Sequence, residues 1–340
     1  MLDILETVDQ WLEQNRAVAL ATVVETWGSA PRRVGSKMAV TADMAMVGSV
    51  SGGCVETAVI EEALSTLEDG KPRLLHFGVS DDTAWDVGLT CGGSISVFVE
   101  PLDVQWWHKA TGDIQNNHLA ATITTLEGDS AGHKALIGAE SEIQYASPAL
   151  DTSTKETFVQ LAQSRLQSGK VEVAEIPVMV DLHQPRPHLI IIGGVHVAMP
   201  LEKFARELGF RVSIIDPRQV FAADERFPVV ETIIHSYPDK ALPQLGLDKN
   251  TYVAVLTHDP KIDDKALITA LPSPVPYVGV LSSTRTHQKR LERLKEAGLT
   301  NEQLSRIRTP AGLDIGAQTP EEIALCILAE IVAVRNGAMP

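Results

Sequence analysis

The chain has 340 residues, 44% of them hydrophobic and 21% charged, and this length and composition favour two globular domains. Its formal net charge of -15 disfavours nucleic acid and anionic membrane surfaces as partners, because a field of that sign repels both. Three cysteines make no disulfide framework and favour a reducing, cytoplasmic location. The acidic start does not resemble a signal peptide, and no run of about 18 apolar residues predicts a membrane span.

The first half of the chain mixes short apolar strands with amphipathic helices, which predicts an α+β domain over residues 1–182. The predicted elements, in order, are a helix over 3–15, strands over 17–25, 37–41 and 46–50, a helix over 55–69, strands near 72–77 and 94–100, a hairpin over 118–138, a helix over 154–168 and a strand over 171–180. No internal repeat is apparent in this stretch.

The segment HQPRPH, residues 183–188, places two prolines between apolar strands and predicts the domain boundary. From residue 188 to 340, apolar strands alternate with amphipathic helices, which is typical of a Rossmann-like domain with a parallel sheet. Its predicted elements are strands over 189–194, 211–216, 252–256 and 277–281, with helices to about 208, over 284–297 and over 320–336. The fold class is therefore α/β, with an α+β domain first and a Rossmann-like domain second.

The first strand-to-helix turn of the second domain reads Gly193-Gly194-Val195-His196-Val197-Ala198. Gly193 and Ala198 fit the dinucleotide fingerprint, but Val195 stands where a glycine lets the backbone approach a pyrophosphate. Asp216 ends the next strand, where an acidic partner of the ribose is expected. Gly193, Gly194, His196 and Asp216 are therefore candidate cofactor contacts, and the alternative is a Rossmann fold kept for structure or for another ligand.

Two glycine–cysteine segments mirror each other in the first domain: Gly52-Gly53-Cys54 before a helix, and Cys91-Gly92-Gly93 before a strand. Backbone N–H groups at a helix start favour an anion and lower the pKa of a thiol. Arg32 and Arg33, in the loop GSAPRRVGS, could hold phosphate oxygens. These residues predict a site for a phosphorylated ligand beside a thiol. The alternative is that both cysteines are small buried residues.

A second polar group closes the strand over 252–256, where His258 and Asp259 precede the next helix. They could bind a ligand or move a proton at the strand ends; alternatively Asp259 caps the helix and His258 only packs. Cys326 lies in an apolar helix and is predicted to be core, and Thr319, Pro320 and Glu322 predict the cap of that helix. The sequence shows no spacing of cysteine or histidine ligands typical of zinc.

Taken together, these motifs resemble the XdhC/CoxI family, the accessory proteins of xanthine dehydrogenase and related molybdenum hydroxylases. In the first domain the resemblance rests on GSAPRRVGSKMAV, GSVSGGCVE and GLTCGGSISVFVEPL. In the second it rests on IIGGVHVA, GFRVSIIDPR, AVLTHDP, YVGVLSS and TPAGLDIGAQTPEEIALCILAEI. Two departures lie at the mouth of the Rossmann domain: Val195 replaces the central glycine, and Ser282-Ser283-Thr284-Arg285 replaces a Gly-Ser-Arg stretch.

The resemblance implies a chaperone rather than a metabolic enzyme. Such a protein would bind molybdenum cofactor (molybdopterin), protect it while a terminal sulfur is installed, and deliver it to an apo molybdenum hydroxylase. A cysteine desulfurase would be the second partner. The runner-up function is an NAD(P)-dependent oxidoreductase, which Val195 argues against, and the third is a redox or scaffold protein without ligand chemistry. The sequence leaves the oligomeric state open, with a homodimer as one candidate.

Overall fold

The computed structural model describes residues 1–28, 32–78, 93–165, 167–282 and 284–338. The chain divides into two compact units, Met1–Pro185 and Arg186–Pro340. Among the described residues, no helix is both long and apolar enough to cross a membrane.

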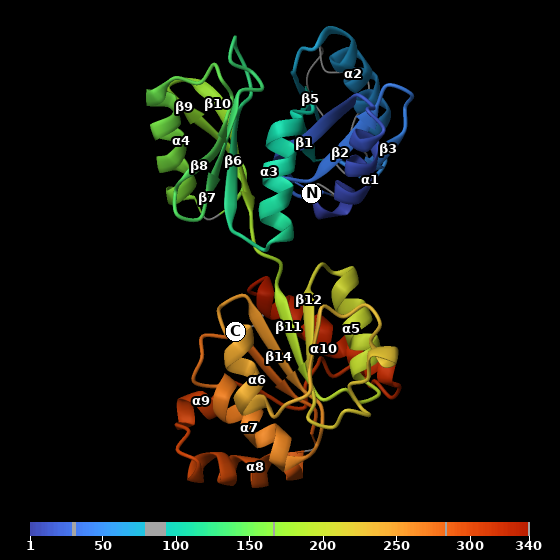
Figure 1. Ribbon diagram of the computed structural model, residues 1–340, viewed down its shortest axis with the longest axis vertical. Helices are drawn as coiled ribbons and strands as arrows, with labels where there is room; N and C mark the ends of the chain where they lie inside the picture. Colours follow the sequence, from blue (N-terminus) through green and yellow to red (C-terminus); the bar gives the residue numbers. More distant parts are fainter. Residues whose placement is uncertain (29–31, 79–92, 166, 283, 339–340) are drawn as a thin grey trace. The chain divides into compact units, whose positions relative to one another are not determined.

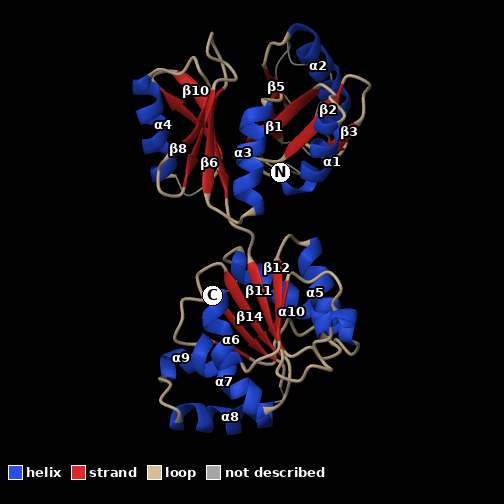
Figure 2. Ribbon diagram, viewed as in Figure 1, coloured by secondary structure: helices blue, strands red, loops and turns tan. Residues whose placement is uncertain are grey.

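The first unit contains two antiparallel five-stranded sheets (Figures 1 and 2). The first sheet has the order β3-β2-β1-β5-β4 and the second β8-β7-β6-β10-β9. The elements of the first sheet are α1 (Leu2–Glu13), β1 (Val18–Trp27), β2 (Lys37–Thr41), β3 (Met46–Gly48), α2 (Glu56–Asp69), β4 (Arg73–Phe77) and β5 (Ser94–Pro101). Those of the second are α3 (Val104–Gln115), β6 (Ala120–Thr125), β7 (Lys134–Gly138), β8 (Ile143–Ala146), α4 (Thr152–Ser164), β9 (Gly169–Val173) and β10 (Ile176–His183).

These two sheets are repeats of one unit, because each is built from the same succession of elements, helix–three strands–helix–two strands, in the same spatial order. The turns repeat as well. Asn15 and Asn117 both end the leading helix with positive φ, at 55° and 60°. Gly35 and Gly132 both precede the second strand, at φ 87° and 82°. The sequence shows no internal repeat, but the structure repeats one order of elements and two of its turn conformations.

One connection differs sharply between the two repeats. Sixteen residues, 78–93, separate β4 from β5, whereas two residues, Ala174 and Glu175, separate β9 from β10. Both residues of the short turn have positive φ, at 48° and 68°, as a two-residue hairpin requires. The predicted single strand over 171–180 is therefore wrong, because this turn divides it into β9 and β10.

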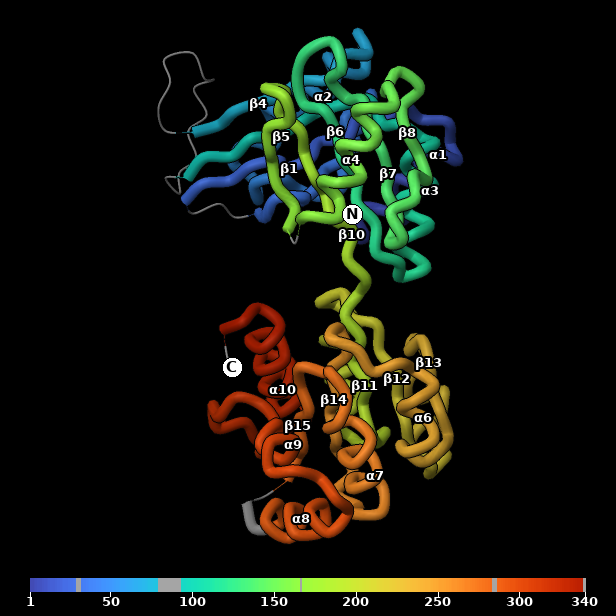
Figure 3. Tube along the Cα trace, turned by 90° about the vertical axis from the view of Figure 1, so that its left-hand side faces the viewer, coloured from blue at the N-terminus to red at the C-terminus, as the bar shows by residue number. Residues whose placement is uncertain are grey.

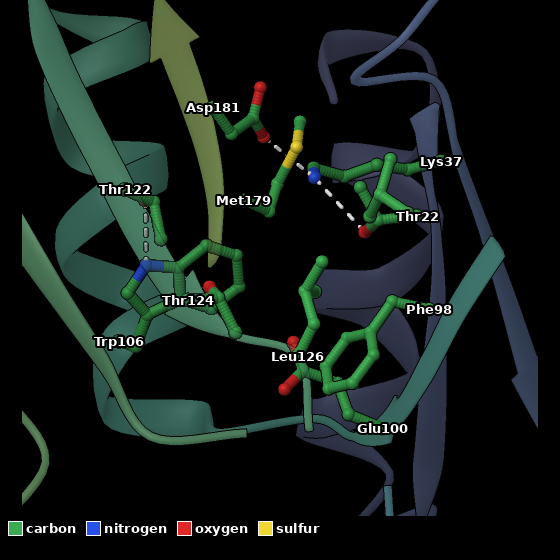
Figure 4. Close-up of a pocket in the computed structure, with 11 residues that line it drawn as sticks. Thr22, Lys37, Phe98, Glu100, Trp106, Thr122, Thr124, Leu126, Met179 and Asp181 are labelled. Carbon is green, nitrogen blue, oxygen red and sulfur yellow. Dashed lines mark hydrogen bonds and ion pairs between the residues drawn. The ribbon is translucent and has the colours of Figure 1, made fainter. Parts of the chain in front are cut away.

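The two repeats are joined by charged pairs on the faces that meet. Lys37 of β2 reaches Asp181 of β10 at 2.8 Å, and Lys134 of β7 pairs with Glu100 of β5. Figure 4 shows the first pair beside a small cavity between the sheets, which Trp106 and Met179 also line. Burial alone would raise the pKa of Asp181, but the charge and hydrogen bond of Lys37, together with His183 and the amino terminus, lower the pKa to about 2. The matched pairs place a lysine of each repeat against an acid of the other.

The second unit has one parallel sheet of order β13-β12-β11-β14-β15-β16, the Rossmann order (Figure 3). The prediction of a Rossmann-like domain is confirmed. Its elements are β11 (His188–Ile192), α5 (Ala198–Glu207), β12 (Arg211–Ile215), a 3-10 turn (Asp224–Arg226), β13 (Thr232–Ile234), α6 (Pro238–Leu245), β14 (Thr251–Val255), α7 (Pro260–Ala270), β15 (Tyr277–Val280), α8 (Thr284–Glu296), α9 (Asn301–Ser305), β16 (Ile307–Arg308) and α10 (Pro320–Arg335). The strand predicted over 252–256, third in the predicted order of this unit, is its fourth strand, because β13 precedes it.

Helices cover both faces of the parallel sheet, which explains its nearly continuous apolar strands. Helices α5 and α10 pack on one face, and α6 and α7 pack on the other. Thr319, Pro320 and Glu322 form the predicted cap of α10, and Cys326 is buried in that helix as expected.

A buried histidine at the start of this sheet makes the stability of the unit depend on pH. His188 is 4% exposed, and its Nε2 lies 2.8 Å from Ser213 Oγ. Burial, helped by nearby Arg211, lowers the pKa of His188 from 6.5 to about 4. The unfolded chain therefore binds a proton between these values that the folded chain does not bind, and stability falls as pH drops from about 6.5 towards 4.

We expect the free energy of unfolding to fall by about 2 kcal/mol from this residue between pH 7 and pH 5. The variant His188→Gln keeps a hydrogen-bonding side chain but does not titrate. Its free energy of unfolding should therefore fall by about 2 kcal/mol less between pH 7 and pH 5 than that of the unaltered protein. Urea unfolding at the two pH values measures the difference. Equal pH slopes in the variant and the unaltered protein would rule out His188 as the cause.

Candidate functional site

Parts of three sequence motifs of the first unit directly follow or precede strands at the same end of its first sheet. At this end β1 finishes at Trp27, β4 finishes at Phe77 and β5 begins at Ser94, and the register pairs Trp27 with Ser94 and Phe77 with Ile95 (Figure 3). We call this end the cysteine edge. The arginine loop follows β1 there, the turn holding Cys54 follows β3, and Gly93 directly precedes β5. Cys91 and Gly92 lie outside the described residues.

The turn over residues 49–55, which we call the cysteine turn, wraps around the side chain of Glu56. Glu56 Oε1 accepts hydrogen bonds from Ser49 Oγ at 2.7 Å and from the backbone N–H groups of Ser51 and Gly52, each at 2.9 Å. Glu56 Oε2 accepts from Gly53 N–H at 2.8 Å and from Ser51 Oγ. The N–H groups of Ser51, Gly52 and Gly53, which are expected from the sequence to face a phosphate, therefore donate to a carboxylate of the chain itself.

The electrostatics of the turn agree with its geometry. Burial of Glu56, which is 8% exposed, would raise its pKa, but the hydrogen bonds from Ser51 and Ser49 outweigh burial and lower the pKa to about 2. Glu56 is thus a carboxylate at neutral pH, and it also places a negative charge at the start of α2, where the helix dipole favours one. The sequence motif GSVSGGCVE contains Glu56 but does not disclose this role.

The other predicted residues of this edge have distinct positions. Cys54 is partly exposed and packs against the core cluster beneath α2. Gly53 has φ 124°, and a Cβ there would meet open space, so glycine is needed for its backbone conformation rather than for room. Arg32 donates to Ser49 O at 3.0 Å and pairs with Asp3, whereas Arg33 is exposed. Trp27, which no sequence motif singles out, is 71% exposed at the same edge.

In the second unit the glycine turn is packed closely against its neighbours. A Cβ at Gly193 would lie 2.4 Å from Thr257 Cγ2, and one at Gly194 would lie 2.2 Å from Phe221 O. Both glycines are therefore required by packing alone. Val195 packs partly against the core, and His196 is exposed.

Asp216 is fully buried, and its carboxylate is already used within the protein. Its oxygens accept from Gly194 N–H at 3.0 Å and from the guanidinium of Arg218 at 2.9 and 2.8 Å. A ribose hydroxyl would have to displace these donors, so the geometry does not favour the expected ribose contact. The acidic residue expected beside a ribose in the NAD(P)-dependent alternative is thus already paired within the chain.

At the end of β14 the expected helix cap is present, but His258 is exposed and does not pack as that alternative supposes. Asp259 caps α7, its side chain accepting from Lys261 N–H at 2.9 Å. His258 is exposed with φ 61°. Within the described part of the chain, no three His, Cys, Asp or Glu side chains are grouped closely enough to hold a metal ion.

Comparison with known proteins gives two matches to sequence models of one family. Residues 189–331 match the XdhC Rossmann domain, and residues 11–78 match the XdhC and CoxI family. A solved structure described as a xanthine dehydrogenase from Bacillus halodurans superposes with a TM-score of 0.79 at 25% identity, covering 98% of this chain and 96% of that one.

Three curated relatives match almost the whole chain. The uncharacterized protein YqeB of Escherichia coli is 29% identical over 96% of this chain, which spans 45% of that relative's length. A protein of Bacillus subtilis described as a probable xanthine dehydrogenase subunit is 26% identical, covering 97% of this chain and 96% of the relative. The molybdenum cofactor insertion chaperone PaoD of Escherichia coli is 28% identical, covering 98% and 88%. With both units matched by the models of one family, the chain belongs to the XdhC and CoxI family.

Proposed function

We propose that this chain is an accessory protein that binds molybdenum cofactor at the cysteine edge, assists its sulfuration and delivers it to a xanthine dehydrogenase-type molybdenum hydroxylase. The names of two relatives, a molybdenum cofactor insertion chaperone and a probable xanthine dehydrogenase subunit, support the general role. A cysteine desulfurase as sulfur donor and an apo-hydroxylase as recipient follow from the same role, as does a cytoplasmic location.

The observation that carries the proposal is the difference between the two repeats. The second repeat forms the same sheet without either cysteine segment: its helix α4 begins after an ordinary cap, and two residues join β9 to β10. The fold therefore does not require the cysteine turn or the 16 residues between β4 and β5. Two segments that the shared sheet does not need are candidates for a function of their own.

The residues at the cysteine edge fit the cofactor in part. When bound, the cofactor supplies a soft metal centre held by dithiolene sulfurs, and Cys54, a partly exposed residue, offers a thiol of matching softness as a ligand or sulfur carrier. Arg33 is an exposed cation suited to a phosphate. The amides of Gly52 and Gly53 do not fit, because Glu56 occupies them. We propose Cys54, Arg33 and, from the sequence alone, Cys91 as the contacts.

The test is anaerobic purification from cells that make molybdenum cofactor, followed by assay of molybdenum and of oxidised pterin. The proposal expects both to copurify with the protein and to transfer to an added apo-hydroxylase, raising its activity. A protein free of pterin that also fails to bind added cofactor contradicts the proposal.

A further inference from the structure

We infer that Glu56 is the positioning residue of the cysteine turn: its carboxylate takes the place of a bound anion on the turn's N–H groups and so fixes the backbone that carries Cys54. Five hydrogen bonds converge on this one carboxylate, three from backbone N–H groups and two from serine hydroxyls. The consequence for cofactor retention rests on the proposed function of Cys54, whereas the positioning itself does not.

A relay connects Glu56 to the backbone of Cys54. Ser51 Oγ donates to Glu56 Oε2, and the same oxygen accepts from Cys54 N–H at 3.0 Å and from Val55 N–H at 3.1 Å. Ser49 adds a second link, because its hydroxyl donates to Glu56 and accepts from Gly52 N–H at 2.9 Å. The backbone N–H groups of residues 51–55 are therefore hydrogen-bonded to Glu56, either directly or through the hydroxyl of Ser51. Cys54 lies in this segment.

The two glycines of the turn explain why such an anchor is needed. Gly52 and Gly53 have φ of 88° and 124°, and glycine backbones lose the most conformational freedom on ordering. Because these residues have no side chain to pack, hydrogen bonds from their N–H groups hold them in place. Both N–H groups donate to the carboxylate of Glu56. Removing the carboxylate should release them together.

Comparison with the second repeat separates this arrangement from ordinary helix capping. The equivalent helix, α4, is capped by Asp151, whose side chain accepts from Thr154 N–H at 2.7 Å. That local cap is enough to start a helix in the same scaffold. The hydrogen bonds from the turn to Glu56 occur in the repeat that carries the cysteine segments. This is expected if Glu56 positions the turn that holds Cys54 and does not merely start a helix.

The experiment compares Glu56→Ala and Glu56→Gln with Glu61→Ala, a matched control that removes a carboxylate from the exposed face of the same helix. Hydrogen exchange, read by mass spectrometry, follows residues 49–56, with residues 134–138 of β7 reporting global unfolding. Peptide mapping after iodoacetamide gives the alkylation rate of Cys54 itself. Each measurement is repeated with sodium formate, a carboxylate small enough to enter the vacated space.

For Glu56→Ala we expect amide protection in residues 49–56 to fall roughly 10- to 100-fold, the loss that follows when hydrogen bonds to a charged group are removed. The alkylation rate of Cys54 should change with it, formate should restore both, and Glu61→Ala should change neither. Unchanged protection and alkylation, or a loss that formate does not reverse, would overturn the positioning role. If Glu56→Ala also loses protection over 134–138, Glu56→Gln decides, because it keeps the length of the side chain and should lose protection only in the turn.

Pterin content separates this inference from the proposed function. If the turn loosens as expected while pterin content is unchanged, Glu56 positions the turn and the proposed role of Cys54 fails. If Cys54→Ser loses the pterin while the Glu56 variants keep native exchange and alkylation, the proposed function stands and the positioning role fails.

Discussion

Replacing Arg290 with alanine is expected to destabilise the Rossmann-like unit by about 3–5 kcal/mol, the cost of breaking a buried ion pair from one side. Arg290 is 1% exposed, and its guanidinium donates to Asp263 Oδ2 and to Ser282 Oγ, both at 3.0 Å. Asp263 is fully buried and also accepts from Thr257. Without Arg290 the buried carboxylate would lose its cationic partner, and burial already raises the pKa of Asp263.

Arg293, on the same helix, provides the matched control. It pairs with Asp264 through both Nε and Nη2, but its side chain is 38% exposed, so Arg293→Ala should cost less than about 1 kcal/mol. Urea unfolding at pH 7 compares the two variants. Equal losses would show that the buried pair contributes no more than the exposed one.

The serine variants of two cysteines should separate function from stability. Cys54→Ser should remove most of the copurified pterin and change the free energy of unfolding by less than about 0.5 kcal/mol, since Cys54 is partly exposed. Cys326→Ser should keep the pterin and cost about 1–3 kcal/mol, because it buries a hydroxyl in α10, where Cys326 is 4% exposed.

Pterin assay and urea unfolding on the same preparations measure both effects. If Cys54→Ser unfolds the protein yet retains cofactor, Cys54 is a core residue and the proposed site is wrong. If Cys326→Ser loses cofactor at unchanged stability, the functional thiol lies in the second unit instead.

The parts of the fold that sequence predicts are those with strong hydrophobic periodicity. Strands β11, β12, β14 and β15 and helices α5, α8 and α10 of the second unit have it, and so do β1, α1 and α2. Helix α3 escapes prediction because Trp106, Trp107, Thr111 and Gly112 are weak helix formers, and packing of the two tryptophans in the core holds it instead. Strands as short as β13 and β16 carry too few residues to show a period.

In the candidate site, too, sequence identifies some features and cannot show others. Sequence identifies Cys54 and its glycines, because glycine pairs beside cysteine are distinctive. It assigns their N–H groups to a phosphate, because it cannot show that the Glu56 side chain folds back over its own turn. Likewise, it cannot show that Arg218 occupies the Asp216 carboxylate. In both places a neighbour in sequence competes with the expected ligand, and only the folded structure reveals that competition.

Molybdenum and pterin content after anaerobic purification bears most directly on the proposed role in cofactor delivery. We expect the unaltered protein to carry molybdenum and pterin in a fixed ratio, the Cys54→Ser variant to carry little of either, and only the loaded protein to activate an apo-hydroxylase. Equal pterin in the two proteins, or none in either after incubation with free cofactor, would contradict a cofactor site at the cysteine edge.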